Sequence, residues 1–83
     1  MKILYFAWLR ERVGLGEEDL TPPGDVVDVA GLVAWLRGRS PGHDAAFAQG
    51  RMVRCAVDQV FATPETPVAG AAEIAFFPPV TGG

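Results

Sequence analysis

The chain has 83 residues, 49% of them hydrophobic, and a formal charge of −3. This length predicts one domain, residues 1–83, close to the smallest size at which a single hydrophobic core is stable without disulfides or bound metals. The high fraction of hydrophobic residues excludes a chain that is disordered throughout. Because acidic residues outnumber basic ones and no basic stripe occurs, nucleic acid is not an expected partner.

Cysteine content excludes a protein held by disulfides or by a multi-cysteine metal site, and hydropathy argues against a membrane-spanning protein. Cys55 is the single cysteine, so neither an internal disulfide nor a multi-cysteine metal site can form. The chain begins with a strand-like segment instead of a basic region and a long apolar stretch, and no window approaches eighteen apolar residues. We therefore expect a soluble, cytoplasmic protein without a membrane contact.

The first third of the chain predicts two strands. Residues 2–9 are an apolar run with aromatic members, which favours a strand. Residues 10–14 indicate a short helical turn that ends at a glycine. Residues 17–21 indicate a second strand, which the turn signal at 22–24 ends. These two strands can pair as a hairpin.

Residues 28–39 predict the main helix of the domain. Four apolar residues recur at helical spacing and form one face: Val29, Leu32, Val33 and Leu36. Asp28 suits the N-cap position. At the other end Gly38 is expected to supply a left-handed stop, and Pro41 forbids continuation.

The remaining chain predicts a loop and three strands. Residues 40–50 are expected to form a loop, with a turn of helix near 44–48. Strands follow at 52–57, 60–62 and 72–77, and the tight turn Asp58-Gln59 joins the first two. One main helix packed on one mixed sheet is an α+β design. If the last strand pairs centrally beside the first, the arrangement is a β-grasp.

The sheet has more apolar surface than one helix can cover. In the first strand both alternating sets are apolar, and in the last strand Ile74 and Phe76 alternate with Ala75 and Phe77. Because a solvated sheet face should carry polar residues, the leftover aromatics predict a protein-binding patch. The alternative is that the loop at 40–50 covers that face.

No catalytic constellation is evident. His43, the only histidine, lies in a polar segment, where a surface position is expected. Cys55 alternates inward on a strand and suits a structural role. The phosphate-binding motifs GxxxxGK[ST] and GxGxxG do not occur, so we expect no nucleotide site in this chain. The acidic residues are scattered, so we expect no metal site either.

The sequence ends at Gly82-Gly83, after an apolar strand and Pro78-Pro79. The prolines fix φ and lack N–H groups, so residues 76–83 should form an extended arm. A terminal carboxylate without a neighbouring Cβ can enter a narrow channel, which predicts that the C-terminus is the reactive group. The alternative is an inert, disordered tail.

Residues 5–14 (YFAWLRERVG) and 73–83 (EIAFFPPVTGG) resemble the opening and the C-terminal signature of the molybdopterin synthase small subunit family. Residues 56–59 resemble its hairpin turn, although the family usually has Asn where Asp58 stands. The resemblance spans the whole chain and implies a ubiquitin-like β-grasp fold. It also implies a sulfur carrier of molybdenum cofactor biosynthesis, in which the Gly83 carboxylate is adenylated, becomes a thiocarboxylate and donates sulfur to precursor Z.

The resemblance also implies partners and contact residues. An E1-like adenylating enzyme uses ATP and magnesium, a sulfur donor protein loads the tail, and the large synthase subunit receives it, so this non-catalytic subunit binds no cofactor itself. Gly82 gives the tip its slenderness. By similarity the partner-binding positions are Phe6, Arg10, Phe61, Phe77, Pro78, Pro79, Val80 and Thr81. A thiamin-pathway sulfur carrier, a ubiquitin-like protein modifier and a plain interaction module remain alternatives.

Overall fold

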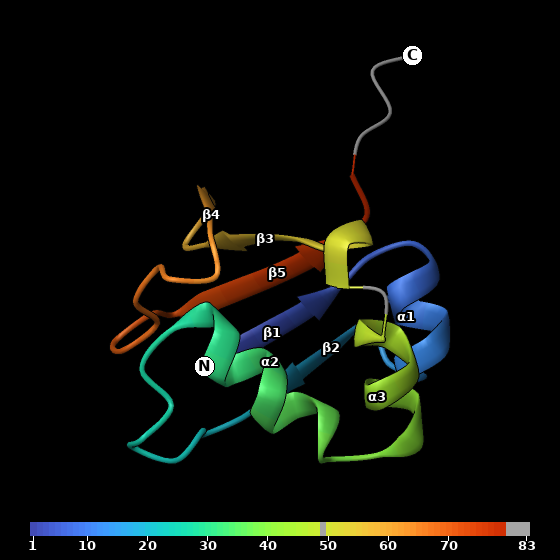
Figure 1. Cartoon of the computed structure of the whole chain (residues 1–83), viewed down its shortest axis with the longest axis horizontal. Coiled ribbons are helices and arrows are strands. Elements are labelled where there is room, and N and C mark those ends of the chain that lie inside the picture. Colours follow the sequence, from blue (N-terminus) through green and yellow to red (C-terminus); the bar gives the residue numbers. More distant parts are fainter. Residues whose placement is uncertain (49, 80–83) are drawn as a thin grey trace.

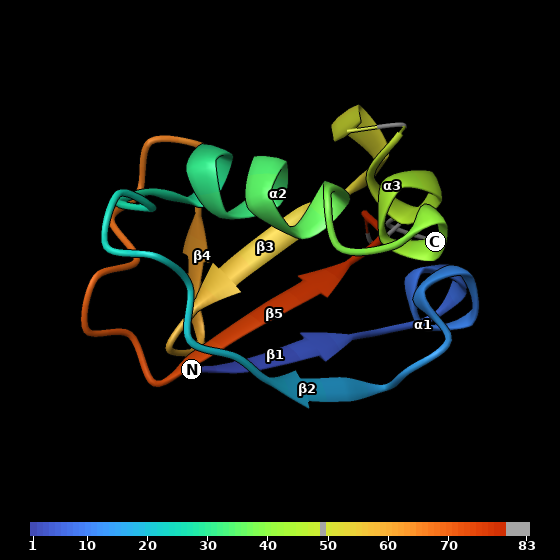
Figure 2. The same cartoon turned by 90° about the horizontal axis from the view of Figure 1, so that it is seen from below.

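The computed structural model describes residues 1–48 and 50–79. In chain order its elements are β1 (Lys2–Tyr5), α1 (Trp8–Val13), β2 (Glu17–Asp19), α2 (Val29–Arg37), α3 (Pro41–Phe47), a 3-10 turn (Gly50–Met52), β3 (Arg54–Val57), β4 (Val60–Ala62) and β5 (Glu73–Phe77). Helices α2 and α3 lie on the same side of one sheet, and α1 lies beyond the end of β1 (Figures 1 and 2).

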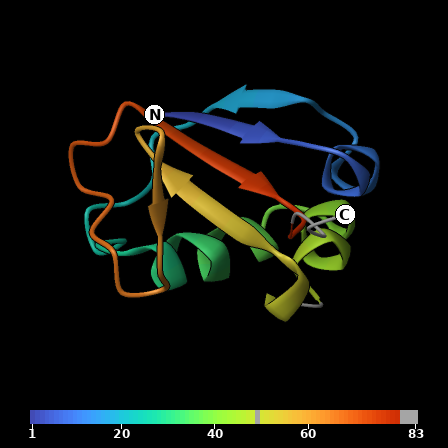
Figure 3. The ribbon, with the colours of Figure 1, turned by 90° about the horizontal axis from the view of Figure 1, so that it is seen from above.

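The five strands form a mixed sheet in the order β2-β1-β5-β3-β4. The central strand β5 runs parallel to its neighbour β1, whereas the pairs β1–β2, β3–β5 and β3–β4 are antiparallel. The prediction that the last strand pairs beside the first is therefore confirmed. The result is the α+β arrangement of a β-grasp, with the sheet wrapped against its helices (Figure 3).

The core lies between the sheet and the helices. From the sheet it takes Ile3, Tyr5, Cys55, Ile74 and Phe76, and from the helices it takes Leu9, Val29, Leu32, Leu36, Ala46 and Phe47. The Phe47 and Phe76 rings meet edge to face at 4.9 Å between centroids. Because such aromatic pairs add to the burial of apolar area, they fix α3 against the centre of the sheet.

The first strand is shorter than the predicted residues 2–9. It ends at Tyr5, because Ala7 adopts a positive φ of 56° and α1 begins at Trp8. Trp8 therefore does not alternate across a strand, and Leu9 enters the core from a helix. The helix ends as predicted at Gly14, whose φ of 91° is left-handed and suits a residue without a Cβ.

The main helix α2 agrees with the sequence pattern, and Asp28 caps it by accepting a hydrogen bond of 2.8 Å from the Gly31 amide. The predicted left-handed stop at Gly38 is wrong. Gly38 keeps a right-handed φ of −78°, and its amide donates to the Trp35 carbonyl, which tightens the last turn. The end of helix α2 is therefore set by the residues that follow, Ser40 and Pro41.

The expected loop at 40–50 is mostly helix α3, which starts earlier than the predicted turn. Ser40 is its N-cap, since the Ser40 hydroxyl accepts from the His43 amide at 3.1 Å, and Pro41 occupies the first helical position. A serine cap followed by proline is a recognisable start signal. The high glycine and proline content of the segment obscured it.

Gly42 marks the closest approach of two helices. A Cβ built on this residue would overlap the Arg12 carbonyl oxygen at the end of α1, and it would also come within 3.3 Å of the Val13 carbonyl oxygen. Both obstacles are backbone atoms, which cannot move aside as a side chain tip does. Glycine at this position therefore lets α3 pack directly against α1.

We expect Gly42→Ala to lower the free energy of unfolding by about 1–3 kcal/mol, the usual cost of overpacking. Gly24→Ala is the matched control, because no atom lies within 4 Å of the Cβ it would add and its φ is not positive. Chemical denaturation of both variants measures the difference. Equal stability of the two variants would show that the helices separate without cost.

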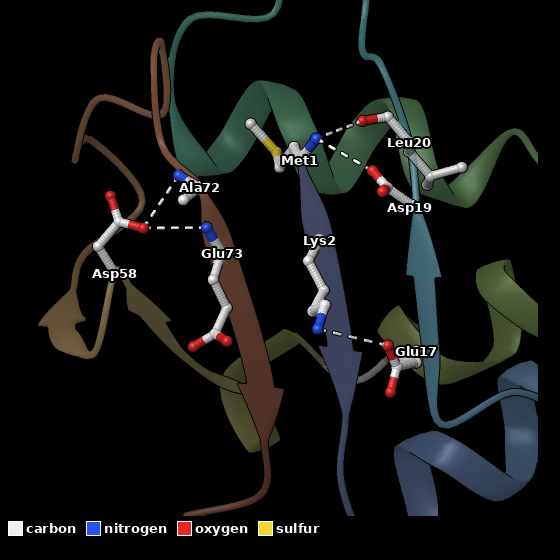
Figure 4. Close-up of polar contacts among 8 residues, drawn as sticks. All are labelled: Met1, Lys2, Glu17, Asp19, Leu20, Asp58, Ala72 and Glu73. Carbon is white, nitrogen blue, oxygen red and sulfur yellow. Dashed lines mark hydrogen bonds and ion pairs between the residues drawn. The ribbon is translucent and has the colours of Figure 1, made fainter.

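The hairpin between β3 and β4 turns at Asp58-Gln59, as predicted. Both residues have positive φ, 48° and 70°, as a type I′ turn requires. One carboxylate oxygen of Asp58 also accepts from the amides of Ala72 (3.0 Å) and Glu73 (2.9 Å), which ties the hairpin to the start of β5 (Figure 4). The acidic residue is thus a structural acceptor.

Candidate functional site: the outer face of the sheet and the base of the arm

The sheet face opposite α2 and α3, here called the outer face, carries an apolar row. Strand register aligns Leu4 of β1 with Ala75 of β5, Ala75 with Ala56 of β3, and Ala56 with Phe61 of β4. Residues aligned across strands share one face, and their neighbours Ile3, Ile74 and Cys55 enter the core on the other. The row therefore runs across four strands on the uncovered side.

Aromatic side chains extend this row. Phe61 is 83% exposed, and its ring lies 6.0 Å from that of the half-buried Phe77. Phe6, the residue after β1, is 48% exposed. Large exposed aromatic groups on one sheet face are typical of protein-binding surfaces.

The alternative that residues 40–50 cover this face is wrong. Helix α3 packs on the other face, where Phe47 contacts the rings of Tyr5 and Phe76. Within the part of the chain that the structure describes, α3 therefore leaves the aromatic surplus of the outer face uncovered. A binding role for Phe6, Phe61 and Phe77 remains a prediction.

The outer face adjoins the base of the arm. Pro78 and Pro79 are half-buried and follow β5 directly, so the chain leaves the sheet next to Phe77 (Figure 1). The predicted contact residues Val80 and Thr81 and the reactive residues Gly82 and Gly83 lie outside the described residues.

Arg10 belongs to the same end of the molecule. It is exposed on α1, which follows β1, and β1 runs parallel to β5, so α1 lies at the end of the sheet where the arm begins. The Arg10 guanidinium folds over Gly16, where a Cβ would lie 3.2 Å from Nε. The structure therefore places Arg10 at the end of the sheet where the arm begins, and its role in partner binding remains a prediction.

The prediction of a surface histidine is wrong. His43 is buried between α3 and the sheet, with its Nε2 2.7 Å from Glu18 Oε2 and its Nδ1 2.7 Å from the Ser40 hydroxyl. The Tyr5 hydroxyl donates to the same Glu18 oxygen at 2.8 Å. The network joins β1, β2 and α3 on the inner face, so it stabilises the fold and lies away from the outer face. The sequence analysis expected a loop where α3 lies, and this explains the wrong prediction for His43.

Electrostatics favour an ionised Glu18. Burial raises the pKa of this carboxyl, but hydrogen bonds from His43 and Tyr5 and the charges of His43 and Arg39 outweigh that effect and hold the pKa below its usual range. Burial, together with the bond to Glu18, raises the pKa of Tyr5, so the phenol stays protonated and donates. An accepting carboxylate thus faces two donors.

This network predicts a specific acid sensitivity. Because the folded-state pKa of Glu18 is lowered, its contribution to stability is present above the unfolded pKa and is lost as pH falls through the folded pKa. At pH 7 we expect Glu18→Gln to cost about 1–3 kcal/mol, the range for disturbing a buried polar group. The cost should shrink towards pH 3, as chemical denaturation at several pH values would show. A cost that does not change with pH would contradict an ionised Glu18.

Cys55 has the structural position that the sequence predicted. It is buried on the inner face of β3, and burial raises the pKa of its thiol to about 11, so the reactive thiolate is scarce at neutral pH. Among residues 1–48 and 50–79 no group of three or more His, Cys, Asp or Glu side chains could hold a metal ion. No helix in this described part is long and apolar enough to cross a membrane.

Strand order and helix placement define the class as a ubiquitin-like β-grasp protein. Two solved structures share this fold. SAMP1 from Haloferax volcanii has a TM-score of 0.74 at 24% identity and covers 100% of this chain and 98% of its own. The putative molybdopterin converting factor, subunit 1, from Pyrococcus furiosus has a TM-score of 0.77 at 24% identity, with 95% of each chain covered.

Sequence comparison identifies the family. Residues 3–83 match the ThiS family, and the chain belongs to it. The chain is also 34% identical to the molybdopterin synthase sulfur carrier subunit of Escherichia coli (strain K12) over 83 residues, which cover 100% of this chain and 99% of that protein. The resemblance deduced from the two ends of the sequence is thereby confirmed.

Proposed function

We propose that this protein is a sulfur carrier of molybdenum cofactor biosynthesis and that the carboxylate of Gly83 carries the sulfur. The observation that carries the proposal is the match to the Escherichia coli sulfur carrier subunit, because it runs through 99% of that protein and includes the Gly-Gly residues of this chain. The partner expected from such a subunit is the large subunit of a molybdopterin synthase.

The chemistry requires help from partners. A terminal carboxylate, with a pKa of about 3.5, is ionised at neutral pH and is a poor electrophile. Attack of its oxygen on the α-phosphorus of ATP, with pyrophosphate leaving, gives an acyl-adenylate. Hydrosulfide then attacks the acyl carbon and AMP leaves, which yields the thiocarboxylate and a proton. We assign the first step to an E1-like adenylating enzyme that uses ATP and magnesium, and the second to a sulfur donor protein.

The described residues suit the role of a carrier. The outer face offers aromatic contacts for docking, and the chain leaves β5 beside that face. Docking makes delivery of the tip effectively intramolecular, so the carrier contributes position while the partner contributes catalytic groups. In this proposal Gly82 allows close approach to the partner's reaction centre, and Pro78 to Thr81 occupy the channel through which the arm enters the partner.

Mass spectrometry tests the proposal directly. After incubation with an adenylating enzyme, ATP, magnesium and sulfide, the intact protein should gain the mass difference between sulfur and oxygen, located on Gly83 by fragmentation. The loaded protein should then form molybdopterin from precursor Z with a synthase large subunit. No mass change under conditions that load the Escherichia coli carrier would refute the proposal.

Complementation distinguishes the pathways. We expect the protein to restore molybdoenzyme activity in a host that lacks its molybdopterin carrier. Rescue only of a host that lacks its thiamin carrier would show the same chemistry in the other pathway.

A further inference from the structure

The two edges of the sheet differ in a way that the proposed function does not explain. The edge strand β2 consists of three acids, Glu17, Glu18 and Asp19, whereas the edge strand β4 consists of Val60, Phe61 and Ala62. Charged residues on an edge strand discourage pairing with another chain. One edge is therefore protected by charge, and the other is uncharged along its whole length.

The hydrogen-bond pattern shows which groups β4 presents outward. Val60 pairs with Val57 next to the two-residue turn, and Ala62 pairs with Cys55, so both residues bond to β3. Phe61 lies between them opposite Ala56, in a pair whose N–H and C=O groups point away from each other. The Asp58 amide, directly after β3, donates to the Glu73 carbonyl, so the backbone groups of Ala56, two residues earlier, face β5 instead.

Phe61 therefore combines an unpaired backbone with an exposed side chain. In this register its N–H and C=O point away from β3, and within the described residues no turn or loop group bonds to them. Its ring is 83% exposed beside Phe77. The neighbouring Val60 is 68% exposed. The open edge and the aromatic part of the outer face thus meet at one residue.

We propose that the edge of β4 receives an extended, apolar strand of the same partner that docks on the outer face, with Phe61 exchanging two backbone hydrogen bonds with it. This inference rests on the proposed function, since it names the contact that the synthase large subunit would make. The β4 edge is continuous with the aromatic part of the outer face. A partner that covers Phe77 and Phe61 on that face must therefore also border this edge, so we assign the edge to the same partner. Strand addition uses backbone bonds for affinity and an adjacent apolar side chain for specificity.

The contact is small and specific in register. Thr63, the next outward-facing residue, already donates its amide to the Thr66 hydroxyl, so pairing cannot extend along the strand. Only one residue pair is available, and the partner's opposing residue would lie beside the Phe61 ring. The β4 edge therefore contributes little buried interface area, and its main effect is to fix the orientation of a docked partner.

Amide hydrogen exchange followed by NMR tests the contact. The probe is the large subunit of a molybdopterin synthase added to the isotope-labelled carrier. On complex formation we expect exchange of the Phe61 amide to slow at least about tenfold. The Asp19 amide, which faces outward from the charged edge β2, is the matched control and should keep its rate.

Two variants separate the backbone bond from the aromatic ring. Phe61→Val removes the ring and keeps the N–H. Phe61→Pro removes both, and proline is tolerated where an edge N–H faces outward. Phe61→Pro should bind the large subunit roughly tenfold more weakly than Phe61→Val, the effect of one lost hydrogen bond. Thermal melting should show that both fold.

The outcomes are distinct. If the wild-type complex forms and transfers sulfur while the Phe61 amide exchanges as fast as before, the edge contact is wrong and the proposed function stands. If Phe61 is protected in carrier dimers without the large subunit, the occupant is a second copy and the inference is wrong. If no complex forms with the large subunit, the inference and the proposed function both fail.

Discussion

Deleting Gly83 is expected to abolish both thiocarboxylate formation and molybdopterin synthesis. The same loss is expected when one residue is appended, because the adenylating enzyme must reach a terminal carboxylate that has no bulky neighbour. The physical reason is that the reactive atom itself is removed or displaced, so no residual activity should remain above background. Intact mass after loading, and product formation in a reconstituted synthase assay, measure the two steps.

Stability supplies the control for this deletion. The described core ends at Phe76, and residues beyond a core contribute little burial, so the melting temperature should hardly change. A matched variant with Gly24→Ala, in the loop before α2, should load and transfer normally. Normal product formation by the protein without Gly83 would end the carrier hypothesis.

The central architecture could be predicted because each of its signals is local. The helical spacing from Val29 to Leu36 and the Asp58-Gln59 turn set α2 and the β3–β4 hairpin. The β-grasp order, by contrast, depends on β5 inserting between β1 and β3. That long-range pairing was a hypothesis from pattern, and the family resemblance made it specific.

The errors at residues 6–9 and at His43 share a cause, which is that tertiary contacts overrode local composition. Residues 6–9 look like a strand continuation, yet Ala7 turns the chain at positive φ so that Leu9 can reach the core from α1. His43 sits among Pro, Gly and Asp residues, which suggests a surface loop. Its burial follows from Glu18 and Tyr5, two strand residues that no sequence window around His43 contains. The apolar outer face could be predicted because alternation within a strand is local.

The outer face should lose affinity for its partner when its aromatic groups are truncated. We expect Phe77→Ala or Phe6→Ala to weaken binding to the synthase large subunit by about 1–3 kcal/mol, the range for residues at the centre of an interface. Phe77 lies beside Phe61, next to the base of the arm. Isothermal titration of loaded and unloaded carriers gives the affinity.

The reason for expecting folded variants is geometric. Phe6 is 48% exposed, and Phe77 aligns with the exposed Arg54 on the face opposite the core, so neither belongs to the buried cluster. Val27→Ala is the control, because Val27 is 58% exposed in the loop before α2, away from the outer face, and should leave binding unchanged. A large fall in melting temperature with unchanged affinity would place the two phenylalanines in the core. Equal weakening by Val27→Ala would show that affinity does not depend on the outer face.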